Sequence, residues 1–558
     1  MKKYIEGKIV DIQQQCIYQG TLTIEAGKIT AICKGSLATD HPCTQYTTGY
    51  IMPGFIDAHV HIESAMLTPE NFGEVVITKG TVAVVTDPHE IANVLGVAGI
   101  QFMLDNSKKS PIKTFFTIPS CVPATPFDVS GGRVSAAEVE QLAATKQFVG
   151  LSEMMNVPGV LFQDKEVMAK LHTAQKYGYP IDGHAPLLSG ENLKKYTEAQ
   201  ITTDHECSTI EEAEEKIKRG MKILIREGSA ARNYEALKTL IKTHPEATMF
   251  CTDDSHPDEL LSKGHIDKIV RQALRDGFNL FDVLRIASLN PIHHYGLNVG
   301  QLREGDEADF IVVDNLADFN TRAVYICGKK CYTTKESATK KEIVSGLNEE
   351  EKEGLHLNFF NHAEIQVEAL RKEMRKATPV IEVKDGELVT QLYTYTPSVE
   401  TANLEAVIKK DILKIVYLNR YTNGTPQVAF CKGFNLTKGA FASCIAHDSH
   451  NIIAVGCTDA DLCKAINQVI KQKGGLAVSQ ADKVDSLSLP IGGIMSDHKA
   501  PYVAEQYSKL NRLLAGMGCT LRAPFMTLSF LSLVVIPSIK IGEKGLFLYD
   551  QMNWVEEC

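Results

Sequence analysis

Residues 51–61 read IMPGFIDAHVH, an apolar run that ends in two histidines with one residue between them. Alternate side chains of a β-strand point to the same face. His59 and His61 can therefore point into one pocket and bind one metal ion. A lone His-x-His pair is a weak signal, because histidines also serve as hydrogen-bonded core residues. The rest of the chain must show whether further ligands join this pair.

This segment opens a series of eight apolar runs that are rich in Val, Ile, Thr and Phe. Such runs are typical of parallel strands covered on both faces. The other seven are residues 81–86, 113–119, 148–154, 180–185, 201–206, 221–228 and 247–253. Between the runs we expect helices, among them residues 135–145, 165–177, 210–219 and 233–242. Eight strand–helix units in about 250 residues predict an α/β fold with a (β/α)₈ barrel, and an open doubly wound sheet is the alternative.

The barrel segment, residues 50–301, is flanked on both sides by short strand-like stretches broken by turns. We predict that residues 1–49 and residues 302–346 pair into one small β-sandwich domain, which would bring the entry and exit of the barrel together. The charge run LNEEEKEG at residues 347–354 then marks a domain boundary.

Residues 347–558 form the last predicted domain, which mixes strands and helices. We expect strands at residues 388–396, 441–446, 452–456 and 525–536. Apolar residues at helical spacing predict helices over residues 462–470 and 503–514. The segment is therefore predicted to be an α+β domain.

The composition of the chain narrows its class and its partners. It has 558 residues, of which 44% are hydrophobic, and a net charge of −10. This balance excludes a disordered chain and argues against nucleic acid or an anionic membrane as the main partner. The 14 cysteines contain no C-x-x-C pair, and no apolar segment follows the lysines at the N-terminus. We expect a cytoplasmic protein with reduced thiols, acting on a small molecule and assembling as a homo-oligomer.

Further metal-ligating residues stand at the ends of the predicted strands, where barrel enzymes carry their active sites. Glu153, His184, His205 and Asp253 each end one apolar run, as His59 and His61 end the first. Imidazole and carboxylate groups suit Zn, Fe or Mn better than Ca or Mg. Six protein ligands exceed the usual three of one catalytic site and suit two metal ions with a bridging carboxylate.

The chain also resembles a known family over nearly its whole length. The segment PGFIDAHVH at residues 53–61 looks like the opening signature of the amidohydrolase superfamily. Further segments resemble its adenine deaminases, which are known from bacteria: HIESAMLTP (61–69), TDPHEIANVLG (86–96), EMMNVPGV (153–160), DGHAP (182–186), REGSA (226–230), CTDDSHP (251–257), IAHDSHN (445–451) and LPIGGIMS (489–496).

The resemblance implies hydrolysis of adenine to hypoxanthine and ammonia by a metal-activated hydroxide, in purine salvage. It implies two divalent metal ions, Mn or Fe, with Zn as an alternative. Carried over by position, His59, His61 and Asp253 would hold one ion, and His184 and His205 the other. Glu153 would bridge the two ions.

Several other residues are candidates for work on the substrate. Asp253 could carry a proton from the attacking water to the leaving amine. Glu90 or His89 would lie near the purine, although Glu90 could instead favour a helix N-terminus that begins at Pro88. The remaining candidates for substrate binding are Asp254, which could instead cap the next helix, His256, Arg226 and Ser229.

The segment from His447 to His450 reads HDSH and invites comparison with a hydrolase triad. Triads are normally assembled from distant segments, and the chain has no G-x-S-x-G motif. We therefore expect a loop that covers the barrel mouth, in cis or from a neighbouring subunit, or a turn stabilised by its own side chains.

Two other functions remain as alternatives. The first is another amidohydrolase reaction, either deacetylation or hydrolysis of a cyclic amide, on the same metals. The second is a non-catalytic scaffold, which would be expected to lack some of the six ligands. The chain has neither G-x-x-x-x-G-K-[ST] nor G-x-G-x-x-G, so nothing supports a nucleotide-binding ATPase.

Overall fold

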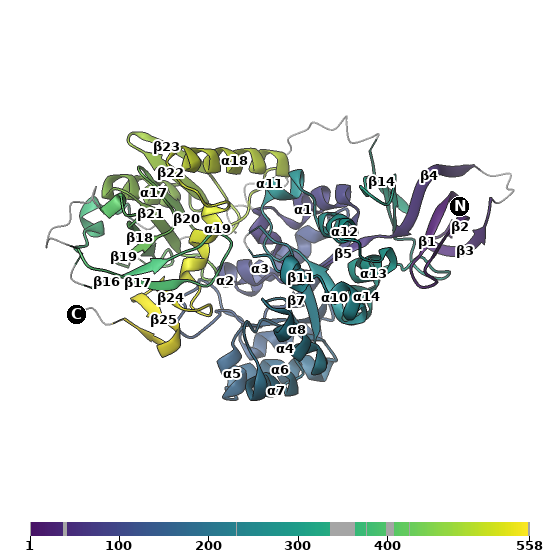
Figure 1. Ribbon diagram of the computed structural model, residues 1–558, viewed down its shortest axis with the longest axis horizontal. Coiled ribbons are helices and arrows are strands. Elements are labelled where there is room, and N and C mark those ends of the chain that lie inside the picture. The colour runs from purple at the N-terminus through teal and green to yellow at the C-terminus, as the bar shows by residue number, and fades with distance from the viewer. Residues whose placement is uncertain are drawn as a thin grey trace.

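The computed structural model describes residues 2–36, 42–229, 231–334, 363–374, 377–397, 407–422 and 424–555. A barrel of eight parallel strands forms its centre (Figure 1). The strands are β5 (Phe55–Val60), β6 (Thr81–Thr86), β7 (Lys113–Ile118), β8 (Phe148–Met154), β9 (Ile181–Gly183), β10 (Thr203–Asp204), β11 (Lys222–Arg226) and β12 (Thr248–Cys251). Parallel bridges from Ile181 to Ile201 and from Val60 to Asp253 close the barrel. The predicted barrel is confirmed, and the open sheet is not the fold.

The first barrel strand begins at Phe55 and not at residue 51, where its apolar run starts. Residues 51–53 are the end of β4 (Cys43–Pro53), a strand of the flanking sheet. Gly54 joins the two strands, and a Cβ atom there would lie 2.2 Å from a methyl carbon of Val82. Because glycine alone fits this close approach to β6, the chain can pass from one sheet to the other at this residue.

Helices surround the barrel strands. They are α1 (Pro69–Val76), α2 (His89–Leu95), α3 (Val97–Ser107), α4 (Ala136–Ala144), α5 (Val157–Leu161), α6 (Lys165–Tyr177), α7 (Gly190–Glu198), α8 (Ile210–Lys218), α9 (Tyr234–Leu237), α10 (Leu240–Thr243), α11 (Pro257–Ser262), α12 (Ile266–Arg275), α13 (Leu280–Leu284) and α14 (Asn290–Tyr295). The single helix predicted over residues 233–242 is two short helices, α9 and α10. Between them the Ile241 N–H bonds to the carbonyl of Lys238, three residues back, which interrupts the α-helical pattern.

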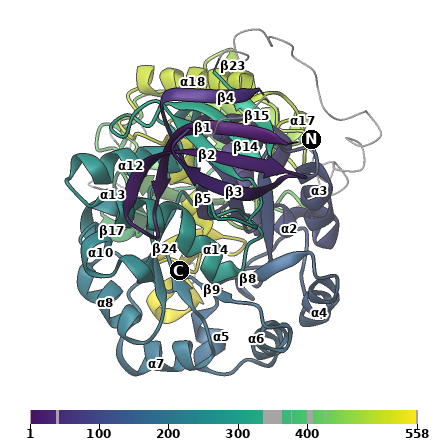
Figure 2. The ribbon, with the colours of Figure 1, turned by 90° about the vertical axis from the view of Figure 1, so that its right-hand side faces the viewer.

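The two flanks of the barrel pair with each other, as expected, and their strands form one seven-stranded sheet where a β-sandwich had been predicted. Its order is β15-β14-β13-β4-β1-β2-β3, and the further strands are β1 (Lys3–Asp11), β2 (Cys16–Glu25), β3 (Lys28–Lys34), β13 (Phe310–Val313), β14 (Thr321–Ile326) and β15 (Lys329–Thr333). Strand β4 pairs with β1 on one side and with β13 on the other, so the entry and exit of the barrel lie side by side. Figure 2 shows this sheet in front of one end of the barrel.

The C-terminal part contains an eight-stranded sheet of order β17-β16-β19-β18-β21-β20-β22-β23. These strands are β16 (Thr378–Glu382), β17 (Gln391–Tyr395), β18 (Leu413–Leu418), β19 (Gln427–Lys432), β20 (Ala440–Ser443), β21 (Ile452–Gly456), β22 (Leu476–Gln480) and β23 (Lys483–Leu487). The two predicted helices are α17 (Asp459–Lys471) and α18 (Ala500–Gly516). A small sheet of β24 (Ile539–Gly542), β25 (Gly545–Leu548) and β26 (Asn553–Trp554) ends the part that the structure describes.

The strand predicted at residues 525–536 is wrong. This segment contains the helix α19 (Pro524–Ser529) and then the 3-10 turn η6 (Phe530–Ser532). Pro524 takes the first helical position, which its fixed φ favours. The helix is buried on all sides, and its sequence, PFMTLS, contains no charged residue and only two hydroxyl residues, so it shows no polar face. A short apolar run of this kind cannot be distinguished from a buried strand by pattern alone.

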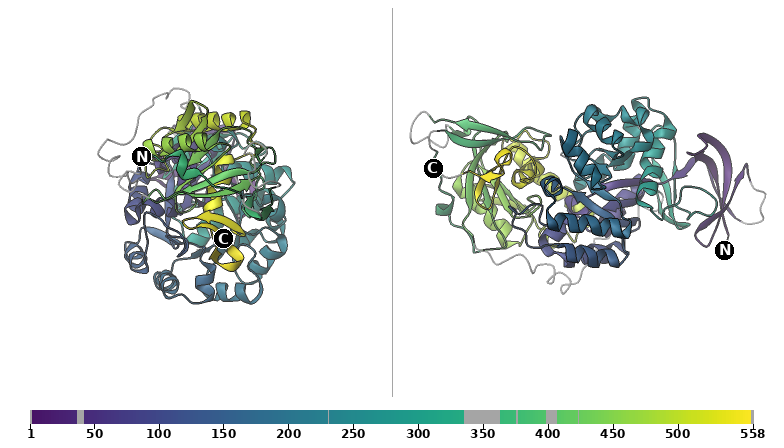
Figure 3. Two further views of the ribbon diagram at one scale, coloured as in Figure 1. Left: turned by 90° about the vertical axis from the view of Figure 1, so that its left-hand side faces the viewer. Right: turned by 90° about the horizontal axis from the view of Figure 1, so that it is seen from below.

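The C-terminal part lies against the end of the barrel opposite the flanking sheet (Figures 1 and 3). One apolar core runs without a break from barrel residues such as Phe55 and Val84 to C-terminal residues such as Phe525 and Leu531. The predicted boundary at the charge run 347–354 lies outside the described residues. Within the ranges given above, no helix combines the length and the apolar character needed to cross a bilayer.

Candidate metal centre and active site

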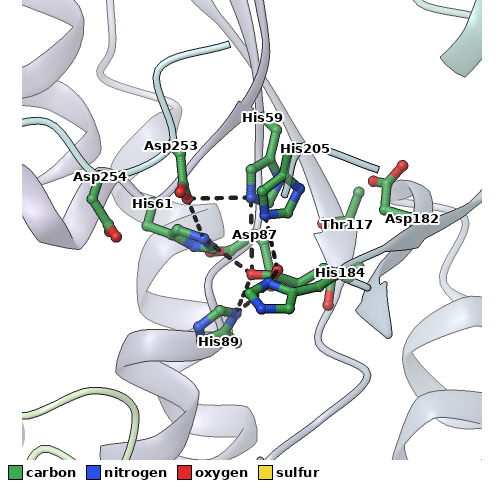
Figure 4. Close-up of polar contacts among 12 residues, drawn as sticks. His59, His61, Asp87, His89, Thr117, Asp182, His184, His205, Asp253 and Asp254 are labelled. Atoms are coloured by element: carbon green, nitrogen blue, oxygen red, sulfur yellow. Dashed lines mark hydrogen bonds and ion pairs between the residues drawn. The ribbon is translucent and has the colours of Figure 1, made fainter. Parts of the chain in front are cut away.

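The six predicted metal ligands meet in one buried cavity at the carboxyl ends of the barrel strands (Figure 4). Figure 4 shows the imidazoles of the four histidines pointing toward one another. All six ligands stand at the carboxyl ends of barrel strands, which meet at one end of the barrel. Nearly 200 residues of sequence separate the first ligand, His59, from the last, Asp253. We call this set the floor of the cavity: His59, His61, Glu153, His184, His205 and Asp253.

Glu153 lies at the centre of the floor and presents one oxygen to each side. Its Oε1 lies 3.2 Å from Nε2 of His61 and 3.8 Å from Nε2 of His59. Its Oε2 lies 2.7 Å from Nδ1 of His184 and 3.2 Å from Nε2 of His205. The two pairs of histidines therefore use different oxygens, which is the arrangement expected of a carboxylate that bridges two cations.

Asp253 completes the first side of the floor. Its Oδ1 lies 3.1 Å from Nε2 of His61 and 3.5 Å from Nε2 of His59. The backbone of Asp253 has a φ of 54°, a left-handed conformation that Asp adopts more readily than most residues. In this conformation its N–H donates to the carbonyl of His59, and its own carbonyl accepts from the N–H of His61. The first and last ligands of the barrel are thus tied together by their backbones.

The floor has the chemistry of a metal site. The buried Nε2 atoms of His59 and His184 have no hydrogen-bond partner among the described residues. An unpaired buried polar atom costs about 1–3 kcal/mol, and a coordinated cation would remove this cost. Ligand atoms of His59, His61 and Asp253 lie within 4.8 Å of one another, as do those of His184, His205 and the neighbouring Glu206. The residues present therefore fit divalent cations.

The acids of the floor are held in their ionised form. Burial alone would raise the pKa of Glu153, but the imidazoles of His184 and His205 lower it well below its usual range. Burial likewise opposes the charge of Asp253, and the guanidinium of Arg226 lowers its pKa well below the usual range. Ionised carboxylates in a buried cavity favour the binding of cations.

Groups behind the floor fix the orientation of its side chains. The Arg226 guanidinium donates to Oδ2 of Asp253 at 2.6 Å and also pairs with Glu206. Gly183 lies before His184, and a Cβ atom there would lie 2.4 Å from the carbonyl oxygen of Thr203. Glycine therefore lets β9 and β10 approach closely enough to place His184 beside His205.

Two acids near the floor had not been predicted. Glu206 follows His205 directly, pairs with Arg226 and lies 3.5 Å from Nε2 of His205. Asp87 follows β6 directly and accepts a hydrogen bond from Nδ1 of His89 at 2.7 Å. His89 in turn lies 3.6 Å from Oε1 of Glu153. Both acids follow the strand-end rule, because Glu206 is the last residue of the apolar run 201–206 and Asp87 directly follows the run 81–86.

Glu90 is held by the loop that contains the HDSH segment. Its Oε1 lies 2.6 Å from Nδ1 of His447, and its Oε2 lies 2.5 Å from Nε2 of His450. Glu90 also occupies the first turn of α2, as the helix reading of this residue predicts, and its side chain lines the cavity. The loop covers the barrel mouth in cis, which is one of the three arrangements that we considered.

The C-terminal part closes the cavity above the floor with apolar and polar side chains. We call this set the roof: Leu388, His447, Asp448, Phe530, Leu533 and Ile536. The Phe530 ring stacks on the His447 ring, with centroids 4.5 Å apart and planes 15° apart. Sequence reasoning had named the His447 loop but none of the apolar members of the roof.

The predicted substrate-binding residues have different surroundings. Asp254 lines the cavity and accepts a hydrogen bond from the Ser64 hydroxyl, and it does not cap α11. The His256 ring lies instead against Tyr507, whose hydroxyl is 3.1 Å from its Nδ1. Ser229 accepts a hydrogen bond from the His256 N–H. The structure does not bring His256 or Ser229 to the cavity that contains the floor.

A groove with a volume of about 1050 Å³ borders the cavity. Met155 and His184 line both the groove and the cavity. Phe162 and Leu187, which are 85% and 65% exposed, lie along the groove. The groove is therefore positioned as a route by which a small molecule reaches the floor.

The chain is similar to known proteins along its whole length. Residues 50–331 match the amidohydrolase family, and residues 387–553 match the adenine deaminase C-terminal domain. The chain is 48% identical to an adenine deaminase of the archaeon Methanosarcina mazei, over 100% of this chain and 99% of that protein. It is 45% identical to an adenine deaminase of Sulfurovum sp., over 99% of both chains. A solved β-aspartyl dipeptidase of Fervidobacterium islandicum covers 60% of this chain and 96% of its own, at 16% identity and a TM-score of 0.46.

Proposed function

Because the chain belongs to the adenine deaminases of the amidohydrolase family, we propose that it hydrolyses adenine to hypoxanthine and ammonia. The observation that carries the proposal is the position of Glu153 between two pairs of histidines, in a chain related to adenine deaminases along its whole length. The match of residues 387–553 favours this reaction over deacetylation or cyclic-amide hydrolysis. The complete floor argues against a non-catalytic scaffold.

The enzyme is metal-dependent, as its family is, and we assign the ligands from the floor. His59, His61 and Asp253 would hold one ion, His184 and His205 the other, and Glu153 would bridge them. Imidazole and carboxylate donors suit Mn or Fe, with Zn as an alternative. When bound, such ions lower the pKa of a water molecule to about 7 and thereby supply a nucleophile at neutral pH.

The residues of the chain would move the protons of the reaction. A C–O bond forms at C6 of adenine, the C–N bond to the amino group breaks, and ammonia leaves. Asp253 would take a proton from the attacking water on its Oδ1 and give it to the departing nitrogen. Arg226 holds Oδ2 of the same carboxylate, so Oδ1 stays directed at the floor. Such acid–base help is worth about 10²–10⁴-fold in rate.

Groups near Glu90 would meet the charge that develops on the purine ring. His89 and Glu90 lie next to each other in the cavity wall, with Nε2 of His89 3.5 Å from Oε1 of Glu90. Asp254 is an acid of the cavity wall that belongs neither to the floor nor to this pair. We assign it to the binding of a ring nitrogen or of the amino group.

The test is an assay of ammonia release with purified protein loaded with Mn or Fe, across adenine, adenosine, cytosine and guanine. We expect release from adenine and a matching loss of adenine absorbance. Metal analysis of the same sample should give two ions per chain. A fully loaded protein that releases no ammonia from adenine would overturn the proposal.

We further propose that the enzyme acts in the cytoplasm and assembles as a homo-oligomer. The cysteines that the structure describes are free thiols, which is typical of a reducing compartment. The exposed apolar side chains of Leu392 and Tyr393, on the edge strand β17 of the eight-stranded sheet, support a contact between copies of the chain. Light scattering should give a mass above that of one chain, and a monomeric mass at micromolar concentration would exclude the assembly.

A further inference from the structure

The C-terminal part contributes polar atoms as well as apolar walls to the cavity. His447 and Asp448 line it together with Glu153, His184 and Asp253. Both roof residues are almost fully buried, at 2% and 3% exposure. A substrate at the floor would therefore be enclosed by barrel residues on one side and by this loop on the other.

The hydrogen bonds of Glu90 determine which nitrogen of the His447 ring remains free to form a hydrogen bond with a substrate. Both of its carboxylate oxygens are occupied, one by His447 and one by His450. The Nε2 atom of His447 is buried and has no hydrogen-bond partner among the described residues. His450 does not line the cavity. Of these three side chains, His447 thus has a free polar atom in the wall of the cavity.

The ring of His447 is fixed from two directions. Its Nδ1 lies 2.6 Å from Glu90, which sets that nitrogen as the donor and fixes the rotation of the ring. Phe530 stacks on its face. The Nε2 atom lies on the opposite side of the imidazole from Nδ1, so Glu90 and Phe530 together direct it away from the Glu90 carboxylate.

We propose that His447 is a catalytic residue whose Nε2–H donates a hydrogen bond to a ring nitrogen of the purine, and that Glu90 and Phe530 position it. The inference rests on the proposed deamination of adenine. The ionised carboxylate of Glu90 stabilises the ring form that carries a proton on both nitrogens, which is the form able to donate from Nε2. The active site is then built by both parts of the chain, and Glu90 acts through His447 instead of contacting the purine itself.

A matched pair of substitutions tests the role of Nε2. In His447→Asn the amide reaches the position of Nδ1 and keeps the bond to Glu90, but nothing replaces Nε2. In His447→Gln the longer side chain places a donor near the position of Nε2. We expect kcat/KM for adenine to fall about 10²-fold in the Asn variant, and the Gln variant to recover about tenfold of that loss. His498→Gln, at a C-terminal histidine outside the cavity, should keep wild-type activity.

Analogues of adenine that lack one ring nitrogen test whether His447 contacts the purine. If His447 only supported the fold, its substitution would not change the preference of the enzyme among these analogues. The wild-type protein should discriminate against one of 1-deaza-, 3-deaza- and 7-deazaadenine more strongly than His447→Asn does. If that discrimination stays unchanged, or if His447→Asn keeps kcat/KM within twofold, His447 does not contact the ring. A wild-type protein that releases no ammonia from adenine would overturn the proposed function, and this inference with it.

Measurements of metal content and of the unfolding temperature show whether a variant loses activity because it has lost metal or because it no longer folds. Both His447 variants should bind two ions per chain and unfold at a temperature close to that of the wild type. Phe530→Leu is a second, independent variant, because it removes the stacking without changing a polar atom. We expect a loss of about tenfold in kcat, with unchanged metal content. Wild-type kcat in Phe530→Leu would show that the stack does not position His447.

Discussion

The floor and the roof of the cavity are built in different ways. The floor takes its six polar ligands from the ends of parallel strands, where the barrel itself brings them together. The roof comes from a loop, a turn and strand-flanking residues of the C-terminal part, and it combines two polar residues with four apolar ones. The comparison suits a division of roles in which, on the proposed function, the floor would hold metal and the roof would hold the purine. Each prediction below tests that division, from the largest expected effect to the smallest.

The largest effect is expected from Glu153→Ala in the floor. Both cation positions lose a ligand, because each oxygen of Glu153 faces a different pair of histidines. We expect fewer than two ions per chain and a loss of activity on the order of 10³-fold. Metal analysis and the ammonia assay measure the two together. The matched control is Glu140→Ala, at a surface glutamate paired with Lys176. A Glu153→Ala variant that keeps two ions per chain and full activity would refute the assignment of Glu153.

A smaller effect is expected from Glu90→Gln beneath the roof. The substitution keeps the shape of the side chain but removes the charge that faces both His447 and His450. We expect activity to fall about 10²-fold while two ions per chain remain bound. Loss of metal in this variant would contradict the division between floor and roof.

Arg226→Met tests the support behind the floor. Removal of the guanidinium leaves Asp253 and Glu206 without their cationic partner. Groups that orient metal ligands typically change metal affinity by about 10–100-fold. Competition with a chelator should show weaker binding of one ion. Arg232→Met removes a partly exposed pair with Glu259 and a hydrogen bond to the carbonyl of Gly228, and it should leave the affinity unchanged. Equal values for both variants would argue against the role of Arg226.

The smallest effect on activity is expected from Lys540→Met in the C-terminal part. Lys540 is fully buried, and its Nζ donates to the carbonyl of the roof residue Leu388 at 2.9 Å. No acidic side chain pairs with it in the part of the chain that the structure describes. Burial lowers the pKa of Lys540 to about 7. The variant should keep kcat within twofold of the wild type.

The stability of the Lys540 variant should depend on pH in a defined direction. Between about pH 7 and pH 10.4 the unfolded chain holds a proton on this lysine that the folded chain lacks, so wild-type stability rises with pH across this window. The rise is about 1.4 kcal/mol per pH unit at most. Lys540→Met should therefore gain most over the wild type near pH 6 and least near pH 10. A stability difference that does not change with pH, measured by urea unfolding, would show that Lys540 is charged in the folded protein.

The sequence predicted the floor far better than the roof, for a physical reason. Strand ends of a barrel converge by construction, so His184 and Asp253 could be placed together from their positions in two apolar runs. Leu388 and Phe530 reach the cavity only through the packing of a second domain, which no local period encodes. The segment around Phe530 was even predicted as a strand, because its helix is buried on every face and has no charged side chain. The HDSH loop was recognised, but the sequence did not show that Glu90 was its partner.

The bond between Glu90 and its two histidines has a consequence for folding. A barrel separated from its C-terminal part would lose the two hydrogen bonds that join Glu90 to His447 and His450. The continuous apolar core would at the same time be exposed along the contact. The two parts should therefore melt as one cooperative unit, and neither half should behave as an autonomous module.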